Sequence, residues 1–126
     1  MIVGLGVDVM EVARIQSVLE RHGQNFIDHV FTSAEKAGAP STLIGAAAYY
    51  AGRWSAKEAV SKALGTGIGQ ECLWTDIEIR RETCGRPTVH LSGAGLRTAE
   101  RLGVKHWILS ISHERNLACA SAVAEK

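Results

Sequence analysis

The chain has 126 residues, a formal net charge of +1, and 46% hydrophobic against 21% charged residues. This composition excludes a disordered chain, and the balanced charge argues against a uniformly basic surface for nucleic acid. No apolar run reaches the ~18 residues of a membrane span, and the N-terminus lacks the pattern of a signal peptide. Three scattered cysteines without CxxC spacing fit a reducing compartment. We therefore expect one cytoplasmic domain, residues 1–126, with no membrane segment.

The first third of the chain predicts one strand and two helices. The apolar, glycine-spaced segment 1–7 is typical of a buried strand that ends at Asp8. A helix should follow and stop at Gly23, and its apolar positions at helical spacing are Val12, Ile15, Val18 and Leu19. Thr32 to Glu35 forms a capping-box pattern for a second, short helix that ends at Gly38.

The longest periodic segment runs from about Ser41 to Leu64 and predicts a long helix, with Gly65 where a C-terminal capping glycine belongs. The glycine-rich residues 65–69 then predict a flexible loop. Segment 74–81 alternates apolar with polar residues, which is the pattern of a half-buried strand.

The last third predicts hairpins around one helix. A turn at 84–87 leads into a return strand over 88–91, and a short helix follows over 92–102. Strands over 105–112 and 117–124 should pair through a hairpin. Helices mixed with hairpins predict an α+β fold with a mainly antiparallel sheet.

Glu58 breaks the apolar pattern of the predicted long helix. Ala47, Ala51 and Trp54 lie on nearly the same line of that helix, so an acidic side chain occupies the stripe that should face the core. Burying an unpaired carboxylate costs several kcal/mol, so Glu58 requires a partner. Lys62, one turn later, offers an ordinary ion pair within the helix, worth about 0.3–0.5 kcal/mol.

Asp8 lies at the end of an otherwise apolar strand. Residues 8–11, Asp-Val-Met-Glu, fit a capping pattern, so Asp8 could serve only to cap the following helix. The functional alternative is a metal ligand, because two carboxylates from different elements are the usual minimum for holding Mg²⁺.

His113 ends the predicted strand that carries Trp107, Leu109 and Ile111 on one face. A histidine at this place can simply be half-buried and hydrogen-bonded. The alternative is a general base or a phosphate ligand.

The glycine loop 65–69 resembles a phosphate-binding loop only superficially. It follows a helix instead of preceding one, so the helix dipole has the wrong sign for an anion. Phosphate binding would therefore depend on nearby cations such as Arg53, Lys57 and Lys62. The simpler interpretation is a helix stop followed by a connector.

Arg14 and Arg21 are seven residues apart on the first predicted helix, and therefore share a face. Two such arginines usually belong to a solvated surface. The alternative is a docking patch for an acidic partner.

Taken in order, the motifs resemble the short type of the 4'-phosphopantetheinyl transferase superfamily, the holo-[acyl-carrier-protein] synthases. The resemblance runs from residue 2 to about 124, and the stretch W-S-A-K-E-A-x-S-K-A-L-G is its most specific part. The segments that carry it are 4–8 (GLGVD), 14–15 (RI), 53–68 (RWSAKEAVSKALGTGI), 76–79 (DIEI), 85–87 (GRP) and 110–113 (SISH).

The resemblance implies transfer of 4'-phosphopantetheine from coenzyme A to a serine of apo-acyl carrier protein in fatty acid biosynthesis, releasing adenosine 3',5'-bisphosphate. It assigns Asp8 and Glu58 as ligands of Mg²⁺, with Mn²⁺ as an alternative, and Asp8, Glu58 and Lys62 as the catalytic residues. Cleavage of a pyrophosphate bond is chemistry that a divalent cation assists.

The resemblance also implies binding surfaces and an assembly. The implied coenzyme A contacts are Arg53, Ser61, Lys62, Gly65, Arg86, Pro87 and His113. The implied docking residues for the carrier protein are Arg14, Arg21, Phe26 and Trp54. Longer members of the superfamily are two-lobed, so a chain of about half their length should complete its site as a homotrimer.

Two other functions are compatible with parts of the pattern. A catalytically silent module that binds a carrier protein or a nucleotide would share the fold, but the presence of Asp8, Glu58 and Lys62 argues against it. A nucleic-acid-binding domain has neither a motif nor a basic excess to support it.

Overall fold

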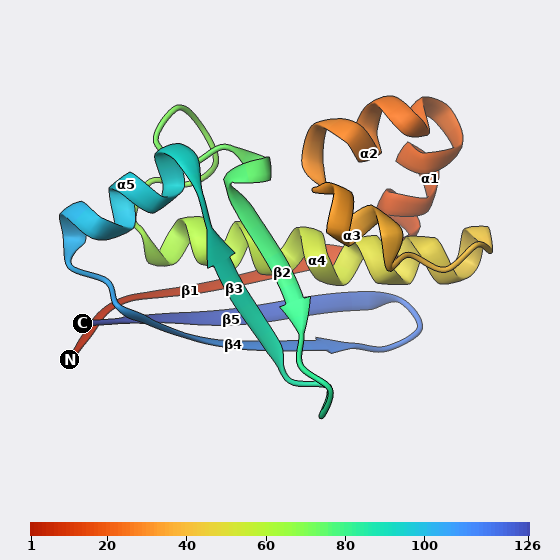
Figure 1. Ribbon diagram of the computed structural model, residues 1–126. Helices are drawn as coiled ribbons and strands as arrows, with labels where there is room; N and C mark the ends of the chain where they lie inside the picture. The colour runs from red at the N-terminus through yellow and green to blue at the C-terminus, as the bar shows by residue number, and fades with distance from the viewer.

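The computed structural model describes residues 1–126 and combines helices with antiparallel strands, as the sequence predicts (Figure 1). The elements in chain order are β1 (Ile2–Glu11), α1 (Val12–His22), α2 (Gln24–Val30), α3 (Ser33–Ala37), α4 (Leu43–Ala63), the 3₁₀ turn η1 (Trp74–Asp76), β2 (Ile77–Arg81), β3 (Pro87–Leu91), α5 (Gly93–Leu102), β4 (His106–His113) and β5 (Leu117–Glu125). None of these helices is long and apolar enough to cross a membrane.

A three-stranded antiparallel sheet of order β1-β5-β4 packs against the long helix α4 (Figure 1). The central strand β5 presents only alanines to the helix, and all four are buried: Ala118, Ala120, Ala122 and Ala124. These small side chains let the helix approach the sheet closely. The hairpin of β2 and β3 forms a second, two-stranded sheet beside β4.

Two glycines bring β1 directly against the backbone of α4. A Cβ atom added to Gly4 would lie 1.8 Å from the carbonyl oxygen of Ala63, and one added to Gly6 would lie 1.8 Å from that of Ala59. No side chain fits in this space, so both positions require glycine. The contact fixes the register of β1 on α4 and places Asp8, two residues further on, beside the helix.

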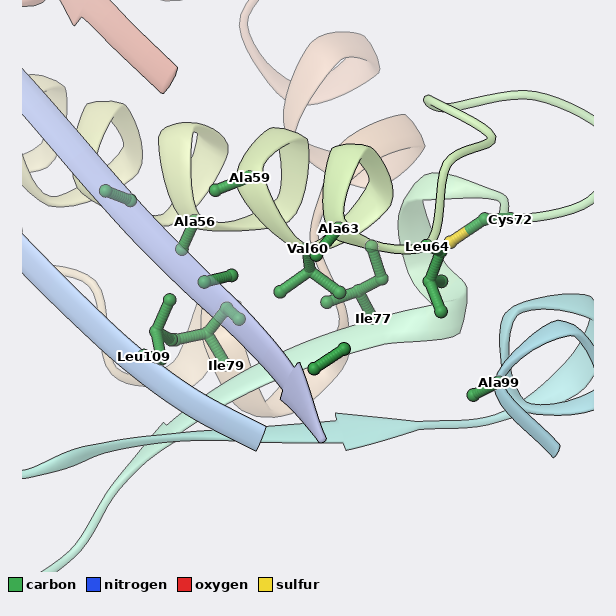
Figure 2. Packing of buried hydrophobic residues seen from close by; sticks show 13 residues of the cluster. Ala56, Ala59, Val60, Ala63, Leu64, Cys72, Ile77, Ile79, Ala99 and Leu109 are labelled. Carbon is green, nitrogen blue, oxygen red and sulfur yellow. The ribbon is translucent and has the colours of Figure 1, made fainter. Parts of the chain in front are cut away.

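Two buried clusters share α4. The C-terminal half of the helix contributes Ala56, Ala59, Val60 and Ala63 to a cluster with β2, β4, β5 and α5, and Figure 2 shows these side chains between the helix and the strands. The N-terminal half packs against β1, α1 and the Val30–Phe31 segment in the other cluster. Both halves of α4 are therefore held on several sides, which gives its polar side chains fixed positions.

Helices α1, α2 and α3 gather over the N-terminal half of α4 (Figure 1); we call residues 12–37 the helical lobe. The predicted capping box of α3 is present: Glu35 N–H donates to Thr32 Oγ1 and Thr32 N–H donates to Glu35 Oε1. The short helix α2 was not expected from the sequence.

Two predicted boundaries and the expected burial of β1 need correction. Strand β1 continues past Asp8 to Glu11, and only one of its faces is buried: Leu5, Val7 and Val9 are 59–68% exposed. Residues 74–76 form a 3₁₀ turn in place of the start of a strand, because the Asp76 carboxylate accepts the Leu73 N–H and closes that turn. The long helix, its capping glycine, the two hairpins and the fifth helix follow the sequence pattern.

Candidate active site

The structure brings Asp8, Glu58 and Lys62 together across the contact between β1 and α4. Lys62 Nζ donates to Asp8 Oδ1 and to the Val7 carbonyl oxygen, each at 3.1 Å. Glu58 lies one helical turn before Lys62, so all three functional groups face the same seam. Residues separated by fifty positions in the sequence thus form one charged cluster.

Burial and charge both act on Glu58. Desolvation raises the pKa of its carboxyl group above the ordinary range, and the negative charge of Asp8 raises it further, while Lys62 partly opposes the shift. The other oxygen of Asp8, Oδ2, is buried and has no hydrogen-bond partner. Two carboxylates that repel each other, one of them with an unsatisfied buried oxygen, form a cluster suited to binding a further cation.

This donor set fits a hard divalent cation. Carboxylate oxygens are the ligands that Mg²⁺ prefers, and Mg²⁺ typically keeps several waters and takes phosphate oxygens beside one or two protein carboxylates. A cation here would satisfy Asp8 Oδ2 and compensate the charge of Glu58. Asp8 and Glu58 are therefore the residues of this chain suited to hold it.

The simpler interpretations of these residues are wrong. Asp8 does not cap α1, since it lies within β1 and the capping position is Glu11, which makes no side-chain capping bond. Glu58 and Lys62 form no ion pair within the helix, because the ammonium of Lys62 turns to Asp8 instead.

Lys57 is not available to a phosphate, contrary to the expectation that it would serve as one of the loop's cations. Its side chain is completely buried, and its ammonium lies 2.7 Å from Glu35 Oε1. The sequence gives a signal for Glu35 only as a capping residue, and nothing in the spacing indicates its buried partner.

Arg53, Ser61 and Gly65, three of the predicted coenzyme A contacts, lie on or just after α4. The Arg53 guanidinium stacks over the Tyr49 ring at 3.9 Å from its centroid, and its Nε is buried without a partner. Ser61 Oγ is buried and donates to the Glu58 carbonyl oxygen at 2.8 Å. Gly65 has a φ of +82°, which lets the chain turn away sharply at the end of the helix.

The other predicted contacts lie elsewhere in the chain. Arg86 and Pro87 line a cleft of about 340 Å³ between the β2–β3 turn and the start of β4, which also contains Lys105 and His106. His113 lines a separate hollow of about 410 Å³ at the far end of β4. Arg86 and Pro87 thus line a different hollow from His113, and neither hollow is lined by Asp8, Glu58 or Lys62.

The predicted docking residues lie in the helical lobe and on α4. Arg14 and Arg21 are exposed on one face of α1 and border a shallow groove. Phe26 packs edge-on against Phe31, with ring centroids 6.0 Å apart. The ring centroids of Trp54 and Trp74 lie 5.3 Å apart. Phe26 and Trp54 therefore both contribute to packing within the fold, in addition to any role in docking.

Known proteins resemble this chain over almost its whole length. The 4'-phosphopantetheinyl transferase superfamily profile matches residues 4–122. The holo-[acyl-carrier-protein] synthase of Natranaerobius thermophilus is 46% identical over 123 residues, which cover 98% of this chain and 97% of the relative. The chain belongs to the 4'-phosphopantetheinyl transferase superfamily, and the family and enzyme class predicted from its motifs are confirmed.

Solved structures extend the likeness to the fold. The crystal structure of holo-[acyl-carrier-protein] synthase from Neisseria meningitidis matches with a TM-score of 0.91 at 33% identity and covers both chains completely. The Helicobacter pylori enzyme, solved in complex with coenzyme A, matches with a TM-score of 0.85 at 28% identity over 96% of this chain and 99% of that one. The predicted fold is thereby confirmed.

Proposed function

We propose that this protein transfers the 4'-phosphopantetheine group of coenzyme A to a serine of an apo-acyl carrier protein, as a holo-[acyl-carrier-protein] synthase. The observation that carries the proposal is the Asp8–Glu58–Lys62 cluster, with its unsatisfied Asp8 Oδ2 at the seam of β1 and α4. The relatives that carry this name, and the coenzyme A complex of one of them, support it.

The reaction breaks one phosphorus–oxygen bond of the pyrophosphate and forms another to the serine oxygen. The serine loses its proton, and adenosine 3',5'-bisphosphate leaves. Bound Mg²⁺, or Mn²⁺ in its place, would neutralise phosphate charge and help align the attacking oxygen with the leaving group. Asp8 and Glu58 would hold the cation.

Lys62 supplies the positive charge of the protein at this seam. The Lys62 side chain is 49% exposed while its ammonium is hydrogen-bonded to Asp8, so it can reach a phosphate oxygen without first leaving a buried position. We propose that the Lys62 ammonium stabilises the negative charge that develops on the leaving group. Arg53, Ser61, Gly65, Arg86, Pro87 and His113 are proposed to bind coenzyme A, with Ser61 acting through its hydrogen bond to the Glu58 backbone.

A homotrimer is part of the proposal, because Arg86 and His113 lie in separate hollows of one chain. The sheet face opposite α4 exposes Leu5, Val7 and Val9 of the edge strand β1, together with Ile108 of β4. Exposed apolar strand faces of this kind mark association surfaces. Packing of three copies through this face would complete each site with residues of a neighbour.

Acyl carrier protein is the proposed macromolecular substrate, with Arg14 and Arg21 as its main contacts and Phe26 and Trp54 as apolar ones. A strongly acidic partner suits two exposed arginines on one helix face, and a local patch is sufficient for electrostatic steering. We place the enzyme in fatty acid biosynthesis in the cytoplasm, a setting in which its three free cysteines stay reduced.

The test is incubation of the protein with apo-acyl carrier protein, coenzyme A and Mg²⁺, followed by mass spectrometry of the carrier. A gain of one 4'-phosphopantetheine mass is expected, and it should require both coenzyme A and the cation. Binding of coenzyme A or carrier with no gain of mass under any metal condition would support the silent-module alternative instead.

A further inference from the structure

The most deeply buried charges of the molecule lie at a junction of four segments. Lys57 Nζ contacts Glu35 Oε1 at 2.7 Å, the Val30 carbonyl oxygen at 2.8 Å and the Trp74 carbonyl oxygen at 3.1 Å. Three acceptors around one nitrogen use all three hydrogens of an ammonium group. The Lys57 side chain is therefore held at a single position, with no freedom to serve a ligand.

Both carboxylate oxygens of Glu35 also have partners within the protein. Its Oε1 accepts the Thr32 N–H at 2.8 Å as well as the Lys57 ammonium, and its Oε2 accepts the Ile79 N–H at 2.7 Å. Both side chains are fully buried, and neither has an unsatisfied polar atom. Such a saturated buried network has one geometry and resists sliding of the elements that it joins.

The elements joined are those that set the geometry of the proposed reaction. Val30 ends α2 and Glu35 belongs to α3, so two of the contacts hold the helical lobe that carries Arg14 and Arg21. Lys57 precedes Glu58 on α4. Asp76, which closes the 3₁₀ turn η1, is the one other charged side chain that is buried, and it is less completely so.

We infer that Lys57, fixed by Glu35, is a positioning residue that holds the Arg14–Arg21 face in register with the Asp8–Glu58–Lys62 cluster. The inference rests on the proposed function. A carrier docked on α1 must deliver its serine to the phosphate beside Glu58, so the distance between docking face and cluster has to be constant. A displacement of 1 Å can cost about 100-fold in rate.

The variant Lys57→Met tests this, because methionine has a similar length but cannot make the three bonds. The matched control is Lys36→Met. Lys36 also forms an ion pair within the lobe, at 2.8 Å from Asp28, but that pair is exposed and joins α3 only to α2. Wild-type transfer is measured first, so a failure of the proposed function is recognised before any variant is compared.

We expect Lys57→Met to lower kcat/KM for apo-carrier by about 100-fold, with the affinity and stoichiometry of coenzyme A binding retained in calorimetry. Lys36→Met should match the wild type. A role in stability alone would reduce the number of coenzyme A sites in step with activity, because only the folded fraction would then be lost. That proportional loss would overturn the inference.

The double variant Glu35→Met, Lys57→Met separates stability from positioning. Replacing both charges avoids leaving an unpaired buried carboxylate, and apolar replacement of a buried pair is often neutral for stability. We expect the double variant to melt closer to wild type than Lys57→Met, while carrier kcat/KM stays low. Recovery of both together would contradict a positioning role.

Two further measurements cover the case in which the methionine variants do not fold. Lys57→Arg keeps the charge but changes the head group, and we expect a loss of carrier kcat/KM with retained coenzyme A affinity; unchanged kcat/KM would count against the inference. Hydrogen exchange of Lys57→Arg should accelerate in α2 and α3 but not in α5. Equal acceleration everywhere would indicate a general loss of stability.

Discussion

The ammonium of Lys62 lies 3.1 Å from Asp8 Oδ1, across the seam between α4 and β1, and forms no ion pair with Glu58 on its own helix. Lys62 therefore compensates the charge of Glu58 only in part, and Glu58 stays beside another carboxylate. The arrangement is unfavourable for the protein alone and would become favourable if the proposed cation bound, which is the usual relation between stability and function at an active site.

Glu58→Gln should therefore stabilise the metal-free protein. The folded-state pKa of Glu58 is raised, so its ionised form opposes folding, and the opposition grows as the pH rises through that pKa. In the presence of a chelator we expect the variant to exceed wild type in free energy of unfolding by roughly a few tenths of a kcal/mol at neutral pH, after allowance for solvent screening. Urea unfolding measures this. The difference in free energy of unfolding should vanish below about pH 4, where the glutamate is protonated in the folded and the unfolded protein. A variant less stable than wild type at pH 7 would show that Asp8 does not disfavour the Glu58 charge.

Gly6→Ala should disrupt the cluster by steric means. The added Cβ would lie 1.8 Å from the carbonyl oxygen of Ala59, so β1 must move away from α4 at a cost of about 3 kcal/mol or more. Thermal unfolding and transfer activity should both decline. Gly69→Ala is the control, since its Cβ would meet nothing within 4 Å, and it should behave as wild type. Equal effects of the two substitutions would refute the close-packed seam.

Leu5→Lys combined with Val7→Lys should dissociate the proposed trimer, because these side chains are 68% and 59% exposed on the apolar face of β1. Analytical ultracentrifugation should show monomers, and transfer should be lost with the shared site. Leu102→Lys, at a 40% exposed leucine on α5, is the control and should leave the trimer intact. A fully active monomer would contradict assembly of the site from several chains.

Charge reversal at Arg14 and Arg21 to Glu should raise the carrier KM by about tenfold or more, since like charges replace attraction at the docking face. Coenzyme A binding should be unchanged. Arg97→Glu, at an exposed arginine of α5, should have no effect on either substrate. If reversal weakened carrier and coenzyme A equally, the docking assignment would be wrong.

The sequence predicted helices and hairpins well where the residues that define them are close together in the chain. The Thr32–Glu35 capping box and the glycine after α4 act on their own turns, so spacing alone identifies them. Helix α2 escaped prediction because Gln24–Val30 is short and largely polar. Strand β1 was predicted as fully buried because apolar residues on both faces of a strand give the same sequence pattern whether or not the second face meets the core.

Local sequence patterns predicted less of the candidate active site. Asp8 and Glu58 stand fifty residues apart, and only the resemblance to a family united them, because no spacing rule relates a strand end to a distant helix. The sequence around Asp8 even favours a capping role that the structure excludes. Glu35 shows the same limitation, since its capping oxygen is visible in the motif while its bonds to Lys57 and Ile79 depend on tertiary packing.

The most direct test compares wild type with Glu58→Gln in the transfer reaction, with apo-carrier, coenzyme A and Mg²⁺, and the carrier mass as the readout. Wild type should convert the carrier to the form heavier by one 4'-phosphopantetheine group, and a chelator should stop the conversion. The Glu58→Gln protein should remain folded and convert it about 100- to 1,000-fold more slowly, the scale expected when charge stabilisation is removed from a transition state. Conversion by the variant at the wild-type rate, or by wild type in excess chelator, would contradict the assignment of Asp8 and Glu58 as the metal-binding centre of a phosphopantetheinyl transferase.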